Sequence, residues 1–440
     1  GIVTGTFSRE FLDLPEAVIV TAMRHHQKYF PASKAGGSLA PGFLAVINLP
    51  ADADGVIRHG NEWVLKARLA DARFFWIEDR KRKLEDRLPD LARVMFQEKL
   101  GSNEARTKRL ETVSAGLAAR LSLSGSTIEQ IRLAARLAKC DLTTGMVREF
   151  PELQGRMGGI YARTEGLPEQ VARAIEEHYL PLSPDGPIPE TITGAVLALA
   201  DKIDLLAGGF AAGLVPKGST DPYGLRRAAQ GVTRILLSAV LAEAAGRISL
   251  KAAIAASLDT YAAQGIPAAP APAAARTAAD FIAQRLRHLM EESGMRFDTA
   301  RAVLAAGFDD VADAWRRAAA LTLLRGAAGE SDFLALAASA KRIRNILSQA
   351  RERGLLTDGR QVDASRLIDA EEIDLHKSVT RVGAGLAGPI DAGDYTAALK
   401  SIASLRPFVD RFFDKVLVMA PDERLKANRL ALLSGLSDLL

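Results

Sequence analysis

The chain has little cysteine and no long hydrophobic segment. Its 440 residues include one cysteine, Cys140, which excludes an intrachain disulfide and a cysteine-rich zinc site. No run of about 18 uncharged apolar residues occurs, and the first residues, GIVTGTFSREF, lack the basic and then apolar layout of a signal peptide. We therefore expect a cytoplasmic protein without a membrane partner. Because the chain begins with Gly1 instead of methionine, we also expect a further N-terminal portion in the natural protein.

Two common catalytic patterns are missing as well. Neither the phosphate-binding pattern GxxxxGK[ST] nor the zinc-peptidase pattern HExxH occurs. Nucleophilic catalysis by Cys140 would need a histidine base, and the nearest histidine along the chain is His178. A single cysteine within ARLAKCDL is far more typical of a small core residue.

The charge is only mildly basic, but the basic residues are clustered. The chain has 57 Lys and Arg against 53 Asp and Glu, a balance that does not identify a nucleic-acid-binding protein. Residues 58–109 contain 14 basic against 9 acidic residues, and residues 337–354 contain five against one. Each stretch is either a phosphate-facing surface or the solvated face of an amphipathic helix.

The apolar pattern predicts a mainly α-helical, multidomain chain. Apolar, β-branched runs at 17–23 and 42–50 predict strands, so we assign residues 1–60 to the remainder of an α/β domain. Helical spacing of apolar residues dominates from residue 61 onward. Pro and Ala alternate within 264–280, which indicates a linker. We therefore expect a helical domain at 61–248, a linker and helical connector at 249–307 and a helical domain at 308–440.

Long stretches of the sequence resemble one family. They are MRHHQKYFP (23–31), GNEWVLKARLADARFFWIEDRK (60–81), KCDLTTGMVREFPELQGRMGGIYA (139–162), ALADKIDLLAGGFAAGLVPKGSTDPYGLRRAAQGVTRIL (198–236) and FFDKVLVMAPDERLKANRLALL (412–433). Together they are similar to the C-terminal two-thirds or so of the β subunit of bacterial heterotetrameric glycyl-tRNA synthetase. The resemblance implies that a separate α subunit carries the active site for glycine activation, with its ATP and Mg²⁺. It further implies that this chain binds no cofactor and no DNA, and instead recognises and positions glycine tRNA.

The helical domain at 61–248 resembles the HD superfamily, whose hydrolases hold a metal through a His, a His-Asp pair and a later Asp. At these positions the sequence has Cys140 and Asp141 for the pair and Asp201 for the later Asp, without the histidines. We therefore expect a degenerate site without metal, where Asp141 and Asp201 cap or brace packed helices. The alternative function is a metal-dependent phosphohydrolase that uses these two carboxylates.

The C-terminal domain resembles the helical anticodon-binding module shared with arginyl-type synthetases. Basic and amide side chains in AASAKRIRNILSQA fall on about one helical turn, where they can contact phosphates and a base edge. These candidates for anticodon binding are Lys341, Arg342, Arg344 and Asn345. Residues 424, 426, 428 and 429 on the last helix are further candidates, although Arg429 is equally suited to an internal brace.

The stretch MRHHQKYFP combines cationic side chains with aromatic rings. Arg24, His26, Lys28 and Tyr29 have the chemistry to hold a sugar-phosphate and stack an unpaired base. In the alternative interpretation Tyr29 and Phe30 belong to the core and His26 is hydrogen-bonded internally, and we expect this for Phe30.

Further phosphate contacts are predicted in the loop PKGSTDPYGLRR. They are Lys217, Arg226 and Arg227, beside the turn residues Asp221 and Pro222. Together these patterns favour a tRNA-recognising subunit that serves glycine–tRNA ligation without performing the chemical step. A helical scaffold that binds only protein is the remaining alternative.

Overall fold

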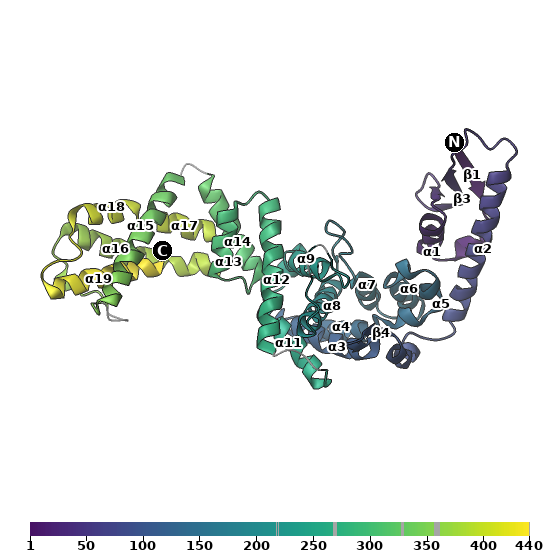
Figure 1. Ribbon diagram of the computed structural model, residues 1–440, viewed down its shortest axis with the longest axis horizontal. Helices are drawn as coiled ribbons and strands as arrows, with labels where there is room; N and C mark the ends of the chain where they lie inside the picture. The colour runs from purple at the N-terminus through teal and green to yellow at the C-terminus, as the bar shows by residue number, and fades with distance from the viewer. Residues whose placement is uncertain (217, 219, 267–270, 327–329, 356–360, 440) are drawn as a thin grey trace. The chain divides into compact units, whose positions relative to one another are not determined.

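The computed structural model divides into two compact units (Figure 1). The first unit comprises Gly1–Leu286 and Asp309–Val311, and the second comprises Arg287–Phe308 and Ala312–Leu440. The structure describes residues 1–439 except 217, 219, 267–270, 327–329 and 356–360.

A three-stranded antiparallel sheet opens the first unit. Its strands are β1 (Ile2–Thr6), β2 (Phe30–Ser33) and β3 (Leu39–Val46), in the order β1-β3-β2. Central β3 pairs Val46 with Ile2 and Leu44 with Phe30. The strand predicted at 42–50 is therefore confirmed over its first part.

The strand predicted at 17–23 is wrong, because these residues are helical. After a 3₁₀ turn (η1, Arg9–Asp13), the helix α1 (Glu16–Thr21) runs into a π-helical turn (η2, Ala22–His26). Val18 and Ile19 are buried together with the side chains four positions later, Ala22 and Met23. Helical geometry thus puts the apolar side chains on one buried face, which outweighs the strand propensity of Val and Ile.

Helix α2 (Val56–Asp79) links the sheet to the helical centre of the first unit. It packs against β1 and against the short helix α5 (Gly145–Glu149). The buried carboxylate of Asp79 accepts hydrogen bonds from the N–H groups of Gly145 and Met146, at 2.8 and 2.9 Å. This carboxylate caps the exposed N–H groups at the start of α5 and fixes α2 to it.

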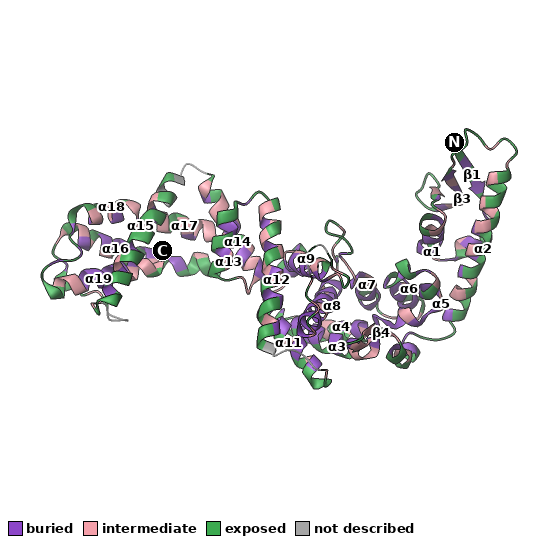
Figure 2. Ribbon diagram, viewed as in Figure 1, coloured by how far each residue is buried: buried purple, intermediate pink, exposed green. Residues whose placement is uncertain are grey.

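The rest of the first unit is helical around α8 (Ile192–Ala211), which is buried on nearly all sides (Figure 2). Helices α3, α4, α7, α9 and α11 pack against it. The other elements are η3 (Glu85–Arg93), β4 (Met95–Gln97), β5 (Gly101–Ser102), α3 (Asn103–Arg120), α4 (Gly125–Leu137), η4 (Cys140–Thr143), η5 (Pro151–Leu153), α6 (Arg156–Thr164), α7 (Glu169–Glu177), α9 (Leu225–Leu236), α10 (Ala239–Ala242) and α11 (Leu250–Ala263).

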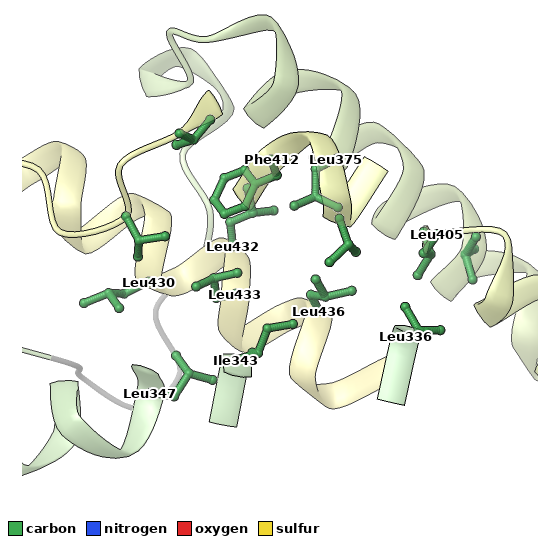
Figure 3. Packing of buried hydrophobic residues seen from close by; sticks show 14 of the residues in the cluster. Leu336, Ile343, Leu347, Leu375, Leu405, Phe412, Leu430, Leu432, Leu433 and Leu436 are labelled. Atoms are coloured by element: carbon green, nitrogen blue, oxygen red, sulfur yellow. The ribbon is translucent and has the colours of Figure 1, made fainter. Parts of the chain in front are cut away.

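The second unit has an apolar core enclosed by five helices (Figure 3). Ile343 and Leu347 of one helix meet Phe412, Leu433 and Leu436 of two others. The five helices are α15 (Glu330–Glu352), α16 (Ala370–Asp391), α17 (Tyr395–Ala403), α18 (Arg406–Lys415) and α19 (Glu423–Leu439). Earlier in the chain come α12 (Ala271–Glu292), which belongs to the first unit as far as Leu286, and then α13 (Phe297–Ala306) and α14 (Val311–Arg325). The turn η6 (Ala364–Arg366) precedes α16.

Arg429 is an internal brace of this core, so its assignment to the RNA-facing surface is wrong. Its side chain is buried and forms ion pairs with the fully buried carboxylate of Glu372 and with Asp369, the latter at 2.7 Å. Its third contact is the carbonyl oxygen of Leu417, at 2.7 Å. Asn428 is also buried and bonded to the backbone of Asp363. Both side chains are therefore occupied within the domain.

The stretch GAGLAG (383–388) has the GxGxxG spacing of dinucleotide-binding loops, but its context differs. Such loops join a strand to a helix, whereas these glycines lie in the interior of α16. The pattern is therefore not a dinucleotide-binding loop.

The expectation of a mainly α-helical, multidomain fold is confirmed. Across the described residues, no helix is both long and apolar enough to cross a bilayer.

We expect Arg429→Met to destabilise the second unit by about 3–5 kcal/mol, because the substitution leaves the Glu372 carboxylate buried without its partner. Hydrogen exchange followed by mass spectrometry should show faster exchange in α16 and α19. The matched control is Arg424→Met on the exposed side of α19, which should change exchange little. Equal effects of the two substitutions would refute the bracing role.

Candidate functional site

The four predicted anticodon-side residues lie on the exposed face of α15. Lys341, Arg342, Arg344 and Asn345 are exposed, while Ile343 between them is buried in the core. The guanidinium carbon of Arg342 lies 4.2 Å from the centre of the Phe413 ring. This cation–π contact holds the guanidinium group itself against the Phe413 ring. The helix thus presents three cations and one amide within about one turn.

The stretch MRHHQKYFP forms a turn with unusual backbone geometry. A π-helical segment ends at His26, and Lys28 has φ of +60°, in the left-handed region that non-glycine residues seldom adopt. Both features are common at functional sites. Arg24 and Lys28 are exposed, so the cations at this turn face solvent.

The aromatic residues of this stretch are arranged differently from the prediction. Tyr29 is 7% exposed and stacked on Phe43 with ring centres 4.6 Å apart, so its face is not available to a base. Phe30, which we expected in the core, is 56% exposed. His26 lies edge-on to Phe150 at 5.2 Å, and its buried Nε2 has no hydrogen-bond partner among the described residues. Nε2 therefore does not supply the internal hydrogen bond considered for His26.

The structure describes two of the three basic residues of PKGSTDPYGLRR, Arg226 and Arg227, which lie in the first turn of α9. Lys217 lies outside the described residues. Arg226 donates hydrogen bonds to the carbonyl oxygens of Gly218 and Thr220 and thereby closes the loop. Arg227 is exposed. The turn itself is fixed by Asp221, whose carboxylate accepts the N–H groups of Leu225 and Arg226 at the start of α9, at 2.9 and 2.8 Å.

The two carboxylates at the degenerate HD positions have different partners. The buried carboxylate of Asp201 pairs with Arg106 at 3.0 Å and with Lys139 at 2.8 Å. Burial alone would raise the pKa of Asp201, but these two charges outweigh it and hold that pKa below its usual range. Of residues 139–141, the one that pairs with Asp201 is thus Lys139.

Asp141 instead caps helix α6. Its Oδ2 accepts the N–H groups of Gly155 and Gly158, at 2.6 and 3.1 Å. Gly155 has φ of +79°, and a Cβ at Gly158 would lie 2.7 Å from Ile175 Cγ2, so both glycines are needed for this approach. Burial raises the pKa of Asp141 to about 6, against the opposite effect of these hydrogen bonds.

The chemistry of these side chains does not fit a metal centre. Positively charged Arg106 and Lys139 stand beside Asp201, where metal ligands would be required. Lys139 Nζ also contacts His178 Nε2 at 2.8 Å, while His178 Nδ1 donates to the carbonyl oxygen of Ile175. Burial, followed by the charge of Lys139, holds the pKa of His178 well below its usual value, which favours a neutral ring. The residues that the structure describes contain no group of three or more His, Cys, Asp or Glu suited to a metal ion.

Cys140 is completely buried, and burial raises the pKa of its thiol. A buried, protonated thiol is a poor nucleophile, which agrees with its interpretation as a small core residue.

Three of the residues around Asp201 were not assigned to a site from the sequence. Arg106, Lys139 and His178 lie in helical or helix-end segments that read locally as solvated polar positions. A signal did exist for Lys139, because it follows the apolar series of α4 at a position where the helix face is buried. A charged residue at such a position implies an internal partner.

Replacing Asp141 by Asn should change how stability depends on pH. The pKa of Asp141 is raised in the folded state, so the folded chain binds a proton more tightly than the unfolded chain and loses stability as pH rises from about 4 to 6. Asn keeps the oxygen that caps α6 but does not ionise. We therefore expect the variant to match the wild type near pH 4 and to exceed its free energy of unfolding by about 1–3 kcal/mol at pH 7.

Urea unfolding of both chains at several pH values measures this difference. Asp54→Asn, at an exposed position of the same unit, is the control and should follow the wild type. If Asp141→Asn loses stability relative to the wild type between pH 5 and 7, the carboxylate is stabilised in its charged form and the argument is wrong.

Comparisons with known proteins agree with the resemblance seen in the sequence. A family model described as glycyl-tRNA synthetase beta subunit matches residues 1–305, and one described as DALR anticodon binding domain matches residues 336–440. Curated glycine–tRNA ligase beta subunits from Moorella thermoacetica and Acidobacterium capsulatum are 43% and 45% identical over 99% and 98% of this chain. A third, from Geobacter sp., is 43% identical over 99% of the chain.

The chain spans about three fifths of the length of these relatives, with 61%, 60% and 61% of their residues aligned. The two family matches follow one another along the chain. The first covers the sheet and the helical centre of the first unit, and the second covers the apolar core of the second unit. The chain therefore belongs to the glycyl-tRNA synthetase β subunit family.

Proposed function

We propose that this chain binds and positions glycine tRNA as the β subunit of a glycine–tRNA ligase. In this proposal the chemical step takes place on a separate α subunit, which binds ATP and Mg²⁺, and the complex works in the cytoplasm. The chain itself holds no cofactor and no DNA. The observation that carries the proposal is the exposed basic turn of α15 inside the segment that matches an anticodon-binding domain.

The basic turn of α15 is suited to RNA because its charges are uncompensated. Lys341, Arg342 and Arg344 have no carboxylate within ion-pair distance among the described residues. Phosphate contacts from such side chains orient a nucleic acid, while Asn345 can read the edge of an unpaired base. The apolar core directly beneath, including Ile343 and Leu347, keeps the helix rigid under the bound RNA.

A second surface is proposed in the first unit at the turn formed by MRHHQKYFP. Arg24 and Lys28 would contact phosphate there, and exposed Phe30 replaces buried Tyr29 as the ring available for stacking a base. Near α9, Arg227 remains a candidate phosphate contact, whereas Arg226 is partly occupied by its loop. Contacts in both units would hold the tRNA by its body and its anticodon, so that its acceptor end is positioned for reaction.

Equilibrium binding of the 440-residue chain to glycine tRNA and to a non-cognate tRNA tests the proposal. Arg342→Ala and Arg344→Ala should each weaken binding of glycine tRNA by about 1–3 kcal/mol and reduce the preference over the non-cognate tRNA. If a phosphate contact is lost, the slope of log affinity against log salt should fall by about 0.7.

The control is Arg276→Ala, because this arginine is 86% exposed on α12 and lies outside the proposed surfaces. Equal binding of both tRNAs with no effect of the α15 substitutions would refute the anticodon-side assignment. Failure to bind any tRNA, together with tight binding of an α subunit, would support the protein-only scaffold instead.

A further inference from the structure

A pocket of about 330 Å³ opens in the helical centre of the first unit, next to the degenerate HD positions. Residues of α3, α8 and α9 line it, together with the segments around Phe96 and Leu182. Its volume lies at the lower end of the range for small-molecule sites. Neither the basic turn of α15 nor the MRHHQKYFP stretch contributes to it, but Arg227, proposed above as a phosphate contact, does.

The lining of this pocket has more positive than negative charge. Its cations are Arg106, Lys202 and Arg227, and its one carboxylate is Asp201. That carboxylate is already shared between Arg106 and Lys139, at 3.0 and 2.8 Å. Lys202 and Arg227 consequently have no carboxylate partner among the described residues.

Lys202 is the more unusual of the two cations because it is buried. Lys202 is 5% exposed, and its Nζ donates one hydrogen bond, to the carbonyl oxygen of Tyr179 at 3.2 Å. Burying an ammonium group without a counter-charge costs free energy. Burial lowers the pKa of Lys202 to about 8; the charge of Asp201 raises this pKa, and the charges of Arg106 and Arg227 lower it further. At neutral pH the ammonium group is still mostly charged. An anion bound in the pocket would therefore reduce the free-energy cost of burying this charge.

The rest of the lining supplies an aromatic face. Tyr223 is 43% exposed. Tyr179 is only half-buried, and the Lys139 ammonium lies 3.9 Å from its ring centre. Leu182, 60% exposed, adds an apolar side chain to the same pocket. A cationic group and an accessible aromatic ring in one pocket match a ligand with a phosphate and a planar base.

We propose that this pocket binds a nucleotide, with its phosphate between Lys202 and Arg227 and its base against Tyr223. Two sources share this chemistry: a free nucleoside monophosphate and an unpaired nucleotide of a bound RNA. No bond is made or broken. The inference goes beyond the proposed function, because a free nucleotide can be tested whether or not the chain binds tRNA.

The test measures binding of adenosine 5′-monophosphate and guanosine 5′-monophosphate to the 440-residue chain by calorimetry, with the matching nucleosides for comparison. We expect the monophosphates to bind more tightly than the nucleosides. Arg227→Gln and Lys202→Met should each weaken monophosphate binding by about 10- to 100-fold, the usual worth of a hydrogen bond to a charged group. Tyr223→Ala should weaken nucleoside and monophosphate alike, since it removes the stacking face.

Arg227 and Tyr223 are exposed, so their substitution leaves the fold intact even if Lys202→Met does not fold. The control is Arg132→Gln, an exposed arginine on α4 away from the lining, which should bind like the wild type. No binding of the monophosphates, equal binding of monophosphate and nucleoside, or equal affinities of the Arg227→Gln and Arg132→Gln chains would each overturn the proposal.

Addition of tRNA to the nucleotide-bound chain separates the two sources. Displacement of the monophosphate from the wild-type chain by tRNA assigns the pocket to a nucleotide of the RNA. Unchanged monophosphate binding in the presence of saturating tRNA assigns it to a free nucleotide. Both results support the pocket as a nucleotide site.

Discussion

The first unit depends on how helix α8 keeps its carboxylates neutralised in an apolar interior. Asp204 is fully buried and pairs with the equally buried Arg109, at 2.7 Å, and the next turn of the helix presents Asp201 to Arg106 and Lys139. A buried carboxylate is tolerated only with close, well-oriented partners, and the loss of one partner costs far more than the intact pair contributes. These pairs therefore set how α3 and the end of α4 lie against α8, since a shift of either helix would leave a buried charge without its partner.

The same pairs explain why the surroundings of Asp201 are unsuited to a metal ion. Asp201 keeps a position that resembles a metal ligand, but the positive charge beside it comes from two side chains of the protein itself. Because these side-chain cations pair with the carboxylate, they would repel a metal ion and compete with it for Asp201. They also leave the neighbouring pocket with surplus positive charge, mainly through Lys202 and Arg227. The excess of cationic over anionic side chains thus disfavours a metal ion at Asp201 and favours the anion proposed for the neighbouring pocket.

The sequence predicted the helices well and the role of individual side chains less well. Apolar spacing located the helices of both units because burial of one face dominates helix formation in proteins. It failed at 17–23, where Val and Ile suit a strand but the burial of residues four apart requires a helix. The expectation of a buried ring at Phe30 also failed. Tyr29 stacks on Phe43 and is buried, whereas Phe30, at the start of β2, is exposed.

Two arginines show most clearly what the local sequence fails to predict about side-chain burial. KRIRN in α15 and ANRLALL in α19 both place a basic residue beside large apolar residues, yet Arg344 is exposed and Arg429 is buried. The difference arises from distant partners. Arg429 reaches Glu372 and Asp369, which lie more than fifty residues earlier, and no residue within its own helix indicates that pairing. For Arg344 no such acid lies within reach among the described residues, so its charge remains in solvent. Whether a basic side chain braces the fold or stays free to bind a ligand therefore depends on where the tertiary structure places acidic side chains. The helical periodicity of the sequence does not contain this information.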